Sequence, residues 1–264
     1  MAGLPVDQYF LLFAMRKKII VLGGSSGIGK ATAERFAKEG WQVLVAAHDL
    51  SQCLATLDGL EGKNHFACEV DVRDDEHLNK LEQIAKEEFG DFDAFVNSVG
   101  ISESHGAIDS NFSAWDNSLQ VMLYGSVKAC RILVPLLKNG GRIIHVTSIH
   151  FERVAKGSSA YGMAKAAITQ FTRSLAIELA LRNILANTIA PGFVNTPMSV
   201  KADGKNEVDS NWFKDNYIKY DHLPLKRAAK PEEIAGVVWF LAGPDASYIT
   251  GSVLTVDGGL TITF

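Results

Sequence analysis

A tyrosine and a lysine stand four residues apart in the segment SSAYGMAKAAITQFTRSLAIELA (158–180), whose apolar residues recur at helical spacing. Residues four apart share one face of a helix, so the phenol of Tyr161 lies beside the ammonium of Lys165. Lowering the pKa of a tyrosine from about 10 to neutrality takes about 4 kcal/mol, and a close cation contributes to that stabilisation. The pair therefore predicts proton exchange with a substrate hydroxyl or carbonyl. A rim tyrosine with a solvated lysine is the alternative that this spacing leaves open.

Ser148 ends the apolar segment RIIHVTS (142–148), thirteen residues before Tyr161. A hydroxyl at the carboxyl end of a buried strand faces the crevice in which α/β sheets bind ligands. We expect Ser148 to donate a hydrogen bond to a substrate oxygen that gains negative charge.

A glycine-rich loop, GGSSGIG (23–29), joins the apolar run KIIVL (18–22) to a helix-like segment. Glycine allows a tight turn and a close approach of the backbone to a pyrophosphate, and the helix N-terminus supplies free N–H groups. The loop predicts nucleotide binding, although a plain strand-to-helix turn also needs glycine.

The elements that must position these residues alternate between strands and helices. Apolar runs typical of strands cover 18–22, 41–46, 65–70, 94–99, 142–147, 184–189 and 252–256. Helical patterns cover 28–39, 75–88, 113–137, 161–181 and 231–242. Continuous apolar runs are typical of strands buried on both faces, so we predict an α/β fold with a single doubly wound parallel sheet.

Composition narrows the partners and the compartment. The 264 residues are 47% apolar and carry a formal charge of −4, which gives no basic surface for nucleic acid. No apolar run reads as a membrane helix, so we expect no membrane partner. Three cysteines without CxxC spacing argue against disulfides and a zinc site. We expect a cytoplasmic protein that uses no metal.

Two segments depart from the alternating pattern. Residues 1–14, before Met15, are interpreted as an appended or flexible segment, with a surface strand or a subunit contact as the alternative. Residues 15–264 are predicted to form one Rossmann-type domain. Within it, the polar and aromatic stretch at about 197–224 is expected to be a substrate lid.

Taken together, these features resemble the short-chain dehydrogenase/reductase family over nearly all of residues 16–262. The resemblance rests on ordered motifs: GGSSGIG (23–29), Asp71-Val72, NSVG (97–100), Ser148, Tyr161-x-x-x-Lys165, APGFVNT (190–196) and YITGSVLTVDGG (248–259). It implies reversible hydride transfer between a nicotinamide cofactor and a ketone or secondary alcohol. The substrate is expected to be of the 3-oxoacyl type or the sugar/polyol type.

The resemblance also implies a role for each site residue. Tyr161 is expected to give or take the proton, Lys165 to lower its pKa and hold the nicotinamide ribose, and Ser148 to position the substrate oxygen. The cofactor is expected to contact Gly23, Ser25, Ser26, Gly27, Ile28, Gly29, His48, Asp71, Val72, Asn97, Gly100, Tyr161, Lys165, Pro191, Gly192, Val194 and Thr196. The substrate is expected to contact Ser148, His150, Tyr161 and Phe193.

Three positions depart from the family pattern. Leu22 replaces a threonine that braces the glycine loop, and Asn97-Ser98-Val99-Gly100 replaces Asn-Asn-Ala-Gly. Met122 replaces a helix asparagine that belongs to a proton relay through lysine and ordered water, and a thioether cannot replace its amide as a donor. The alternative function is therefore a catalytically weakened NAD(P)-binding sensor or structural protein.

The residues at the end of the second predicted strand indicate which nicotinamide cofactor the protein prefers. Ala47 stands where NAD-preferring family members carry aspartate, and His48 follows where NADP-preferring members often carry arginine. We therefore expect a preference for NADP(H). NAD(H) stays as the alternative because the carboxylate of Asp49 is close enough in sequence to reach a ribose hydroxyl. The resemblance further implies a homotetramer or homodimer.

Overall fold

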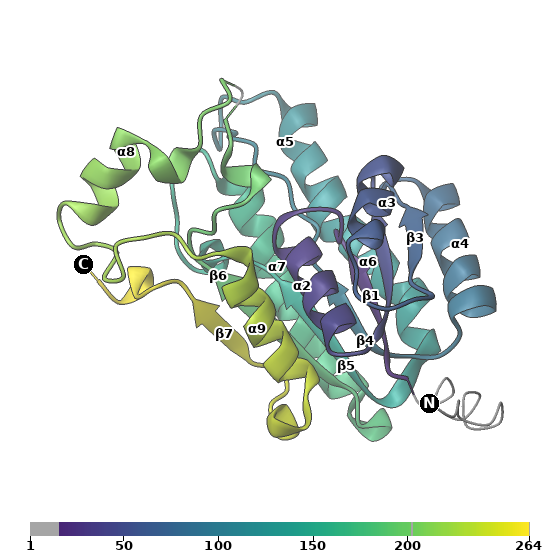
Figure 1. Ribbon diagram of the computed structural model, residues 1–264. Coiled ribbons are helices and arrows are strands. Elements are labelled where there is room, and N and C mark those ends of the chain that lie inside the picture. The colour runs from purple at the N-terminus through teal and green to yellow at the C-terminus, as the bar shows by residue number, and fades with distance from the viewer. Residues whose placement is uncertain (1–15, 202, 264) are drawn as a thin grey trace.

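The computed structural model describes residues 16–201 and 203–263. The interpretation of residues 1–14 as an appended segment lies outside the described residues. Within them the chain forms a central sheet with helices on both of its faces (Figure 1).

Seven parallel strands form the sheet, in the order β3-β2-β1-β4-β5-β6-β7. They are β1 (Lys18–Leu22), β2 (Gln42–Ala47), β3 (Phe66–Glu69), β4 (Phe92–Asn97), β5 (Leu137–Val146), β6 (Leu185–Pro191) and β7 (Val253–Val256). The order reverses between β1 and β4, which is where doubly wound sheets open a ligand crevice. The predicted fold class is confirmed.

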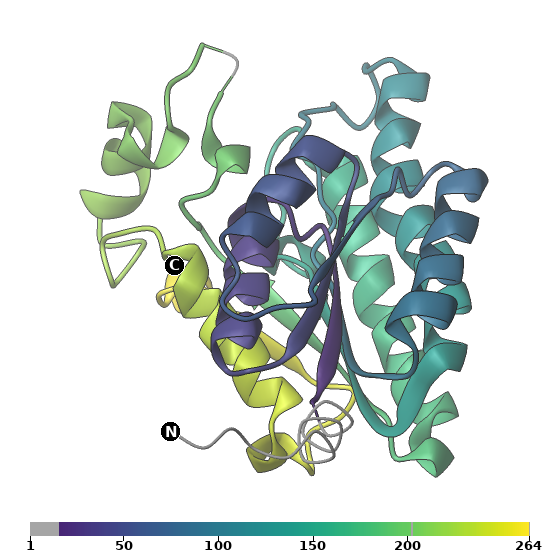
Figure 2. The same cartoon turned by 45° about the vertical axis from the view of Figure 1, so that its right-hand side comes forward.

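One face of the sheet is covered by α2 (Gly27–Lys38), α3 (Leu50–Asp58) and α9 (Pro231–Ala242), and Figure 2 shows α2 and α9 side by side. Phe36 of α2 meets Trp41 and Trp239 edge-on, with ring centres 5.0 and 5.1 Å apart. These rings bury a large apolar area and fix α2, and with it the glycine loop, against the sheet.

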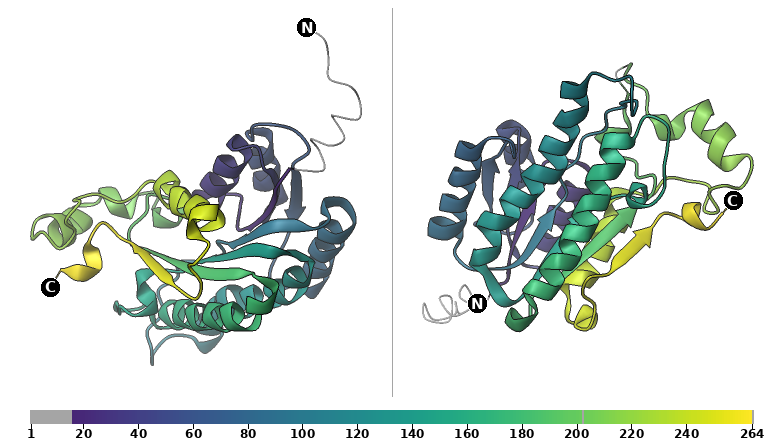
Figure 3. Two further views of the ribbon diagram at one scale, coloured as in Figure 1. Left: turned by 90° about the horizontal axis from the view of Figure 1, so that it is seen from below. Right: turned by 180° about the vertical axis from the view of Figure 1, so that it is seen from behind.

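The other face is covered by α4 (Asp75–Ile84), α5 (Phe112–Leu119), α6 (Gly125–Leu133) and α7 (Ser159–Glu178), seen from behind in Figure 3. Leu78, Leu81, Leu133 and Leu175 of these helices pack on Phe95 of β4 in one buried cluster. The layer places α7, which carries Tyr161 and Lys165, directly over β5 and β6.

The predicted helix 113–137 is interrupted in the structure. A π-helical turn, Gln120–Tyr124, separates α5 from α6, and a 3₁₀ turn follows at Val134–Leu136. The run Phe112–Leu136 is long and apolar enough to cross a membrane, which corrects the expectation that no run would be. Leu133 and Ala129 nevertheless pack into the sheet core, and a buried core helix has the same composition.

Helix α3 was not predicted. Only Cys53 and Thr56 of its nine residues are buried, so the segment shows no continuous apolar stripe. Its start is fixed instead by a polar contact, because the carboxylate of Asp49 accepts the backbone N–H of Gln52 at 3.2 Å.

The stretch 197–224 folds into short turns beside the sheet. Asn211–Phe213 (α8) and the π-helical turn Lys214–Ile218 form its helical part, which stands apart from the helical layers in Figure 1. Phe213 and Tyr217 pack around Phe193, with ring centres 4.9 and 4.7 Å from it. This aromatic contact ties the stretch to the end of β6. Its role as a lid stays a prediction.

Candidate active site

A cleft of about 1020 Å³ opens at the carboxyl ends of the strands. Its lining comes from the glycine loop, from the ends of β2, β4, β5 and β6, from α7 and from the 197–224 stretch. Most of the predicted site residues line it: Gly23, Ser25, Ser26, Gly27, Ile28, His48, Asp71, Val72, Gly100, Ser148, His150, Tyr161, Lys165, Pro191, Gly192, Phe193, Val194 and Thr196. The fold therefore brings residues that are up to 173 positions apart around one space.

Two predicted site residues, Gly29 and Asn97, do not line the cleft. A Cβ on Gly29 would collide with the carbonyl oxygen of Gly23, so this glycine allows the loop to fold onto its own helix. Asn97 is buried and binds neighbouring groups, since its amide donates to Ser126 Oγ at 2.7 Å and its carbonyl accepts Val99 N–H at 3.1 Å. Both residues support the site from behind.

The glycine loop offers an anion-binding helix end to the cleft. Ser26 caps α2 without a side-chain hydrogen bond, and the first turn of α2 carries no acidic residue. The N–H groups and the positive end of the helix dipole are therefore left for a ligand, which is the arrangement that phosphate groups occupy in nucleotide sites. The residues present fit a dinucleotide at this end of the cleft.

Tyr161, Ser148 and Lys165 meet at the base of the cleft. Tyr161 and Lys165 lie one turn apart on α7, and the Lys165 ammonium is 5.6 Å from the centre of the Tyr161 ring. Lys165 Nζ donates to the carbonyl oxygens of Val99 at 3.3 Å and Val146 at 3.2 Å. Val99 lies in the loop after β4 and Val146 ends β5, so the tertiary fold sets the position of the ammonium.

Burial shifts the protonation of this group. It lowers the pKa of the Lys165 ammonium to about 8, because a charge is costly away from water. It raises the pKa of the Tyr161 phenol, and only the hydrogen bond with Ser148 acts in the opposite direction. The direction for Tyr161 is opposite to the one expected from its lysine neighbour, because burial disfavours the phenolate more than the hydrogen bond with Ser148 favours it. Tyr161 is therefore a protonated donor in this state of the cleft.

Residues 23–261 match a family model described as Enoyl-(Acyl carrier protein) reductase. A 3-oxoacyl-[acyl-carrier-protein] reductase of Thermotoga maritima is 33% identical over 252 residues, covering 93% of this chain and 98% of that protein. Carbonyl reductase family member 4 of Xenopus laevis is also 33% identical over 252 residues, covering 94% and 99%. A solved short-chain dehydrogenase/reductase from Serratia marcescens superposes with a TM-score of 0.84 at 33% identity, covering 93% and 98%.

The chain belongs to the short-chain dehydrogenase/reductase family. The resemblance predicted from the motifs is thereby confirmed, and so is an oxidoreductase as the class of enzyme. The alternative of a sensor without turnover gains no support from these relatives, which are named as reductases and a dehydrogenase/reductase.

The replacement of the family threonine by Leu22 leaves the glycine loop braced by backbone groups. The N–H groups of Gly23 and Gly24 both donate to the carbonyl of Ala46, at 2.7 and 3.2 Å. Leu22 itself is fully buried in the sheet core. The loop therefore needs no side-chain hydroxyl at this position.

The replacement of the family asparagine by Met122 lies in the π-helical turn behind Tyr161. The Met122 side chain is 1% exposed and packs in an apolar cluster with Leu119 and Ala164, against which Tyr161 rests. The Met122 carbonyl accepts the Ser126 hydroxyl at 2.5 Å, so it already has a protein donor. The side chains that pack behind Tyr161 on this side are therefore apolar.

At the end of the cleft beside β2, the side chains of His48 and Asp49 have different surroundings. His48 is exposed and lines the cleft, whereas Asp49 does not line it. The Asp49 carboxylate accepts Ser51 Oγ at 2.6 Å and Gln52 N at 3.2 Å, and these hydrogen bonds lower its pKa. The Asp49 carboxylate therefore caps α3. In this structure it does not line the part of the cleft where it would bind a ribose hydroxyl, which is the contact on which the NAD(H) alternative rested.

Several cleft residues were not predicted from the sequence. Arg73 binds the carboxylate of Asp71 through two nitrogens, at 3.0 and 2.6 Å, so the Asp71 side chain is already paired. Others include Ile101, Glu103, Arg153 and Lys156. Only the position of Arg73, two residues after the Asp71 motif, offered a signal. The remaining residues sit on irregular loops that periodicity does not reveal.

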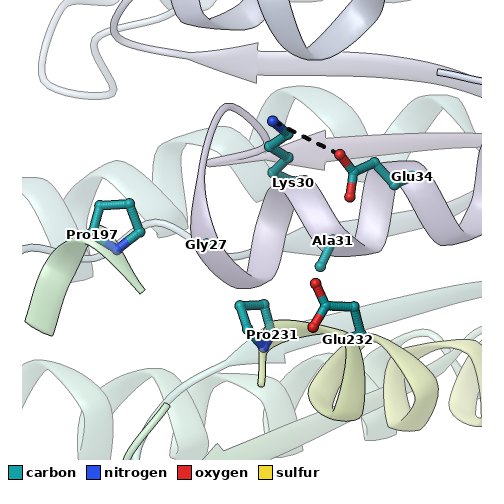
Figure 4. Close-up of a pocket in the computed structure, with 7 residues that line it drawn as sticks. All are labelled: Gly27, Lys30, Ala31, Glu34, Pro197, Pro231 and Glu232. Carbon is teal, nitrogen blue, oxygen red and sulfur yellow. Dashed lines mark ion pairs between the residues drawn. The ribbon is translucent and has the colours of Figure 1, made fainter. Parts of the chain in front are cut away.

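A second, smaller pocket lies between α2 and α9 on the outer side of the glycine loop (Figure 4). It measures about 290 Å³, and Gly27 and Pro197 form its border with the cleft. Lys30 Nζ lies 3.8 Å from Glu34 Oε1, so the lysine charge is balanced within the pocket. The pocket marks the contact between two helices that fix the loop.

Among the residues that the structure describes, no group of three or more His, Cys, Asp or Glu side chains is placed to hold a metal ion. Cys53, Cys68 and Cys130 are buried and unpaired. Burial raises the pKa of the Cys130 thiol to about 12 and those of Cys53 and Cys68 to about 11, so all three are protonated.

Proposed function

We propose that the protein catalyses reversible hydride transfer between a nicotinamide cofactor and a ketone or secondary alcohol, with Tyr161 as proton donor and acceptor. The observation that carries the proposal is the meeting of Tyr161, Ser148 and the buried ammonium of Lys165 at the base of one cleft. A bound nicotinamide dinucleotide supplies or accepts the hydride.

The protein side chains divide the remaining work. In the reducing direction the Tyr161 hydroxyl donates its proton to the carbonyl oxygen. Ser148, which hydrogen-bonds Tyr161, holds the same substrate oxygen as its negative charge develops. Lys165 is fixed by two carbonyls beneath Tyr161 and stabilises the phenolate that forms. A low-dielectric site strengthens each of these contacts.

NADP(H) is the cofactor that the cleft favours, and NAD(H) is the alternative. The glycine loop and the start of α2 would hold the phosphates, with Val194 and Thr196 on the opposite wall. Next to them, Ala47 carries no charge, the Asp49 carboxylate faces α3, and His48 is exposed toward the cleft. A 2′-phosphate would thus meet a hydrogen-bond donor and no acid. Comparison of kcat/KM with NADPH and NADH tests this choice.

The substrate half of the cleft favours a ketone with both polar and apolar parts. His150 and Phe193 line it, with Trp212 and Tyr217 from the 197–224 stretch. A 3-oxoacyl-type substrate is supported by the printed names of relatives, and a sugar- or polyol-type substrate is the alternative. Turnover of 3-oxoacyl thioesters, sugars and polyols, each followed by NADPH or NADH absorbance, separates the two classes.

The same assay decides between an enzyme and a nucleotide-binding protein without turnover. The substitution at Met122 is the observation that favours the second. Tight NADPH binding with no oxidation by any ketone of the panel would reject the proposed activity. Turnover that disappears in Tyr161→Phe would support it.

We also propose that the protein forms a homotetramer or homodimer and resides in the cytoplasm. Phe112 of α5, Ile177 of α7 and Leu181 in the turn after α7 are 75%, 79% and 103% exposed, and a subunit contact would bury such side chains. The three free thiols fit a reducing compartment. Light scattering of the purified protein measures the oligomeric state.

A further inference from the structure

Each reduction cycle consumes the proton of Tyr161, so that proton must be replaced before the next cycle. Behind Tyr161, toward the π-helical turn, lies an apolar cluster that contains the buried thioether of Met122 and no titratable side chain other than Tyr161. Lys165 Nζ donates to the carbonyls of Val99 and Val146, which only accept, so Lys165 itself is the titratable group on this side of Tyr161.

The opposite side of Tyr161 faces His150. The two rings meet edge-on, with their centres 5.7 Å apart, and both residues line the cleft. His150 is half-buried, and its backbone N–H donates to Ser148 Oγ at 3.3 Å. His150 is thus held beside both side chains that contact the reacting oxygen.

One nitrogen of His150 is fixed by the backbone. Nδ1 lies 3.2 Å from the carbonyl oxygen of Arg153, and since a carbonyl only accepts, Nδ1 carries a hydrogen. In the neutral ring Nε2 is then the nitrogen that takes up and releases a proton. Imidazole is the side chain best suited to exchange protons with water near neutral pH.

We propose that His150 returns the proton to Tyr161 from the cleft side, in place of a route through the helix layer. After reduction, the Tyr161 phenolate gains a proton, the His150 imidazolium loses one from Nε2, and the imidazole takes another from water. In alcohol oxidation the three transfers run in reverse. The inference rests on the proposed function, and His150 acts through Tyr161.

The charged and titratable groups around His150 are few. Tyr161 and Lys165 face it from α7, and β6, which also packs against this turn, carries none. Glu152, Arg153 and Lys156 belong to its own loop and are exposed. The only buried cation among them, Lys165, is fixed below Tyr161 on the side away from water.

The experiment compares the first turnover with later ones. His150→Phe keeps an aromatic ring against Tyr161 but cannot carry a proton. With excess ketone, the variant should still oxidise one NADPH per active site, because Tyr161 starts protonated, and this first turnover is the internal reference because a lost substrate contact at His150 slows first and later turnovers alike. Later turnovers should be slower by about ten- to a hundredfold. His222→Phe, at a histidine that does not line the cleft, is the matched control and should behave as wild type.

Chemical rescue separates proton supply from packing. In His150→Ala, added imidazole should restore steady-state turnover in proportion to its concentration. Equal steady-state rates in wild type and His150→Phe, or an absence of imidazole rescue, would overturn the inference. A wild-type protein that turns over no ketone would overturn the proposed function, which these two outcomes leave intact.

Discussion

The ammonium of Lys165 lies 5.6 Å from the centre of the Tyr161 ring, and its hydrogen bonds go to two backbone carbonyls rather than to the phenol. In this structure the ammonium therefore lies over the Tyr161 ring without a hydrogen bond to its hydroxyl. Burial raises the pKa of Tyr161 and lowers that of Lys165, so it favours the uncharged form of both side chains. Formation of a Tyr161 phenolate therefore depends on neighbouring groups that stabilise its charge.

Tyr161→Phe should abolish steady-state turnover while leaving cofactor binding intact. The ring still packs on the Met122 cluster, but the proton that the substrate oxygen needs is gone. We expect kcat to fall about 10²- to 10⁴-fold, the range for loss of a general acid. NADPH absorbance measures turnover, and calorimetry measures the Kd for NADPH. A variant with wild-type kcat would contradict the assignment.

Lys165→Met should change the pH dependence of stability. The pKa of Lys165 falls from 10.5 to about 8 on folding, so its charge disfavours folding by about 3 kcal/mol below pH 8. That penalty disappears as the pH rises from 8 to 10.5, so the stability of the wild type relative to the variant increases across this range.

Urea unfolding of both proteins between pH 7 and 10.5 measures this difference. The free energy of unfolding of wild type relative to the variant should rise by about 3 kcal/mol across the upper part of that range. A constant difference would show that the Lys165 pKa is not lowered.

Gly29→Ala should disrupt the glycine loop. Its Cβ would collide with the Gly23 carbonyl, so the loop must open and the N–H groups of α2 must move. We expect the Kd for NADPH to rise at least about tenfold, a loss of about 1.4 kcal/mol or more. Gly236→Ala in α9 is the matched control, because nothing lies within 4 Å of its Cβ. It should stabilise the helix by about 0.5–1 kcal/mol and leave the Kd unchanged.

Met122→Asn should destabilise the protein without raising kcat. The new amide would be buried among Leu119 and Ala164, and the backbone carbonyl at position 122 is already bound to Ser126. We expect a loss of about 1–3 kcal/mol in the free energy of unfolding. Chemical unfolding and steady-state kinetics test both statements, and a severalfold rise in kcat would show that this side of Tyr161 does supply protons.

Ala47→Asp should reduce the preference for NADPH. Ala47 is 5% exposed at the end of β2 and lines the cleft, so a carboxylate there would repel a 2′-phosphate and bind a ribose hydroxyl. We expect the ratio of kcat/KM for NADPH to that for NADH to fall about tenfold or more. His48→Gln, which keeps a donor but no charge, should lower the ratio less. Wild-type kcat/KM that favours NADH tenfold would overturn the cofactor assignment.

The sequence by itself determined the fold class and the motif residues. Continuous apolar runs predict strands buried on both faces, and the seven strands form where such runs occur, within a few residues. Tyr161 and Lys165 needed only helical spacing to be placed together. The glycine loop needed only its position between the first strand and the first helix.

Only the tertiary structure decided how those residues are engaged. The pairing of Asp71 with Arg73, the turn of Asp49 toward α3 and the apolar environment of Met122 depend on side-chain contacts across loops and helices. Helix α3 was missed because a polar cap, rather than an apolar stripe, fixes it. The periodicity of apolar residues predicts which face of a helix or strand is buried. The pKa of Tyr161 and the proposed proton route past His150 depend instead on side chains that other helices, strands and loops place next to that face.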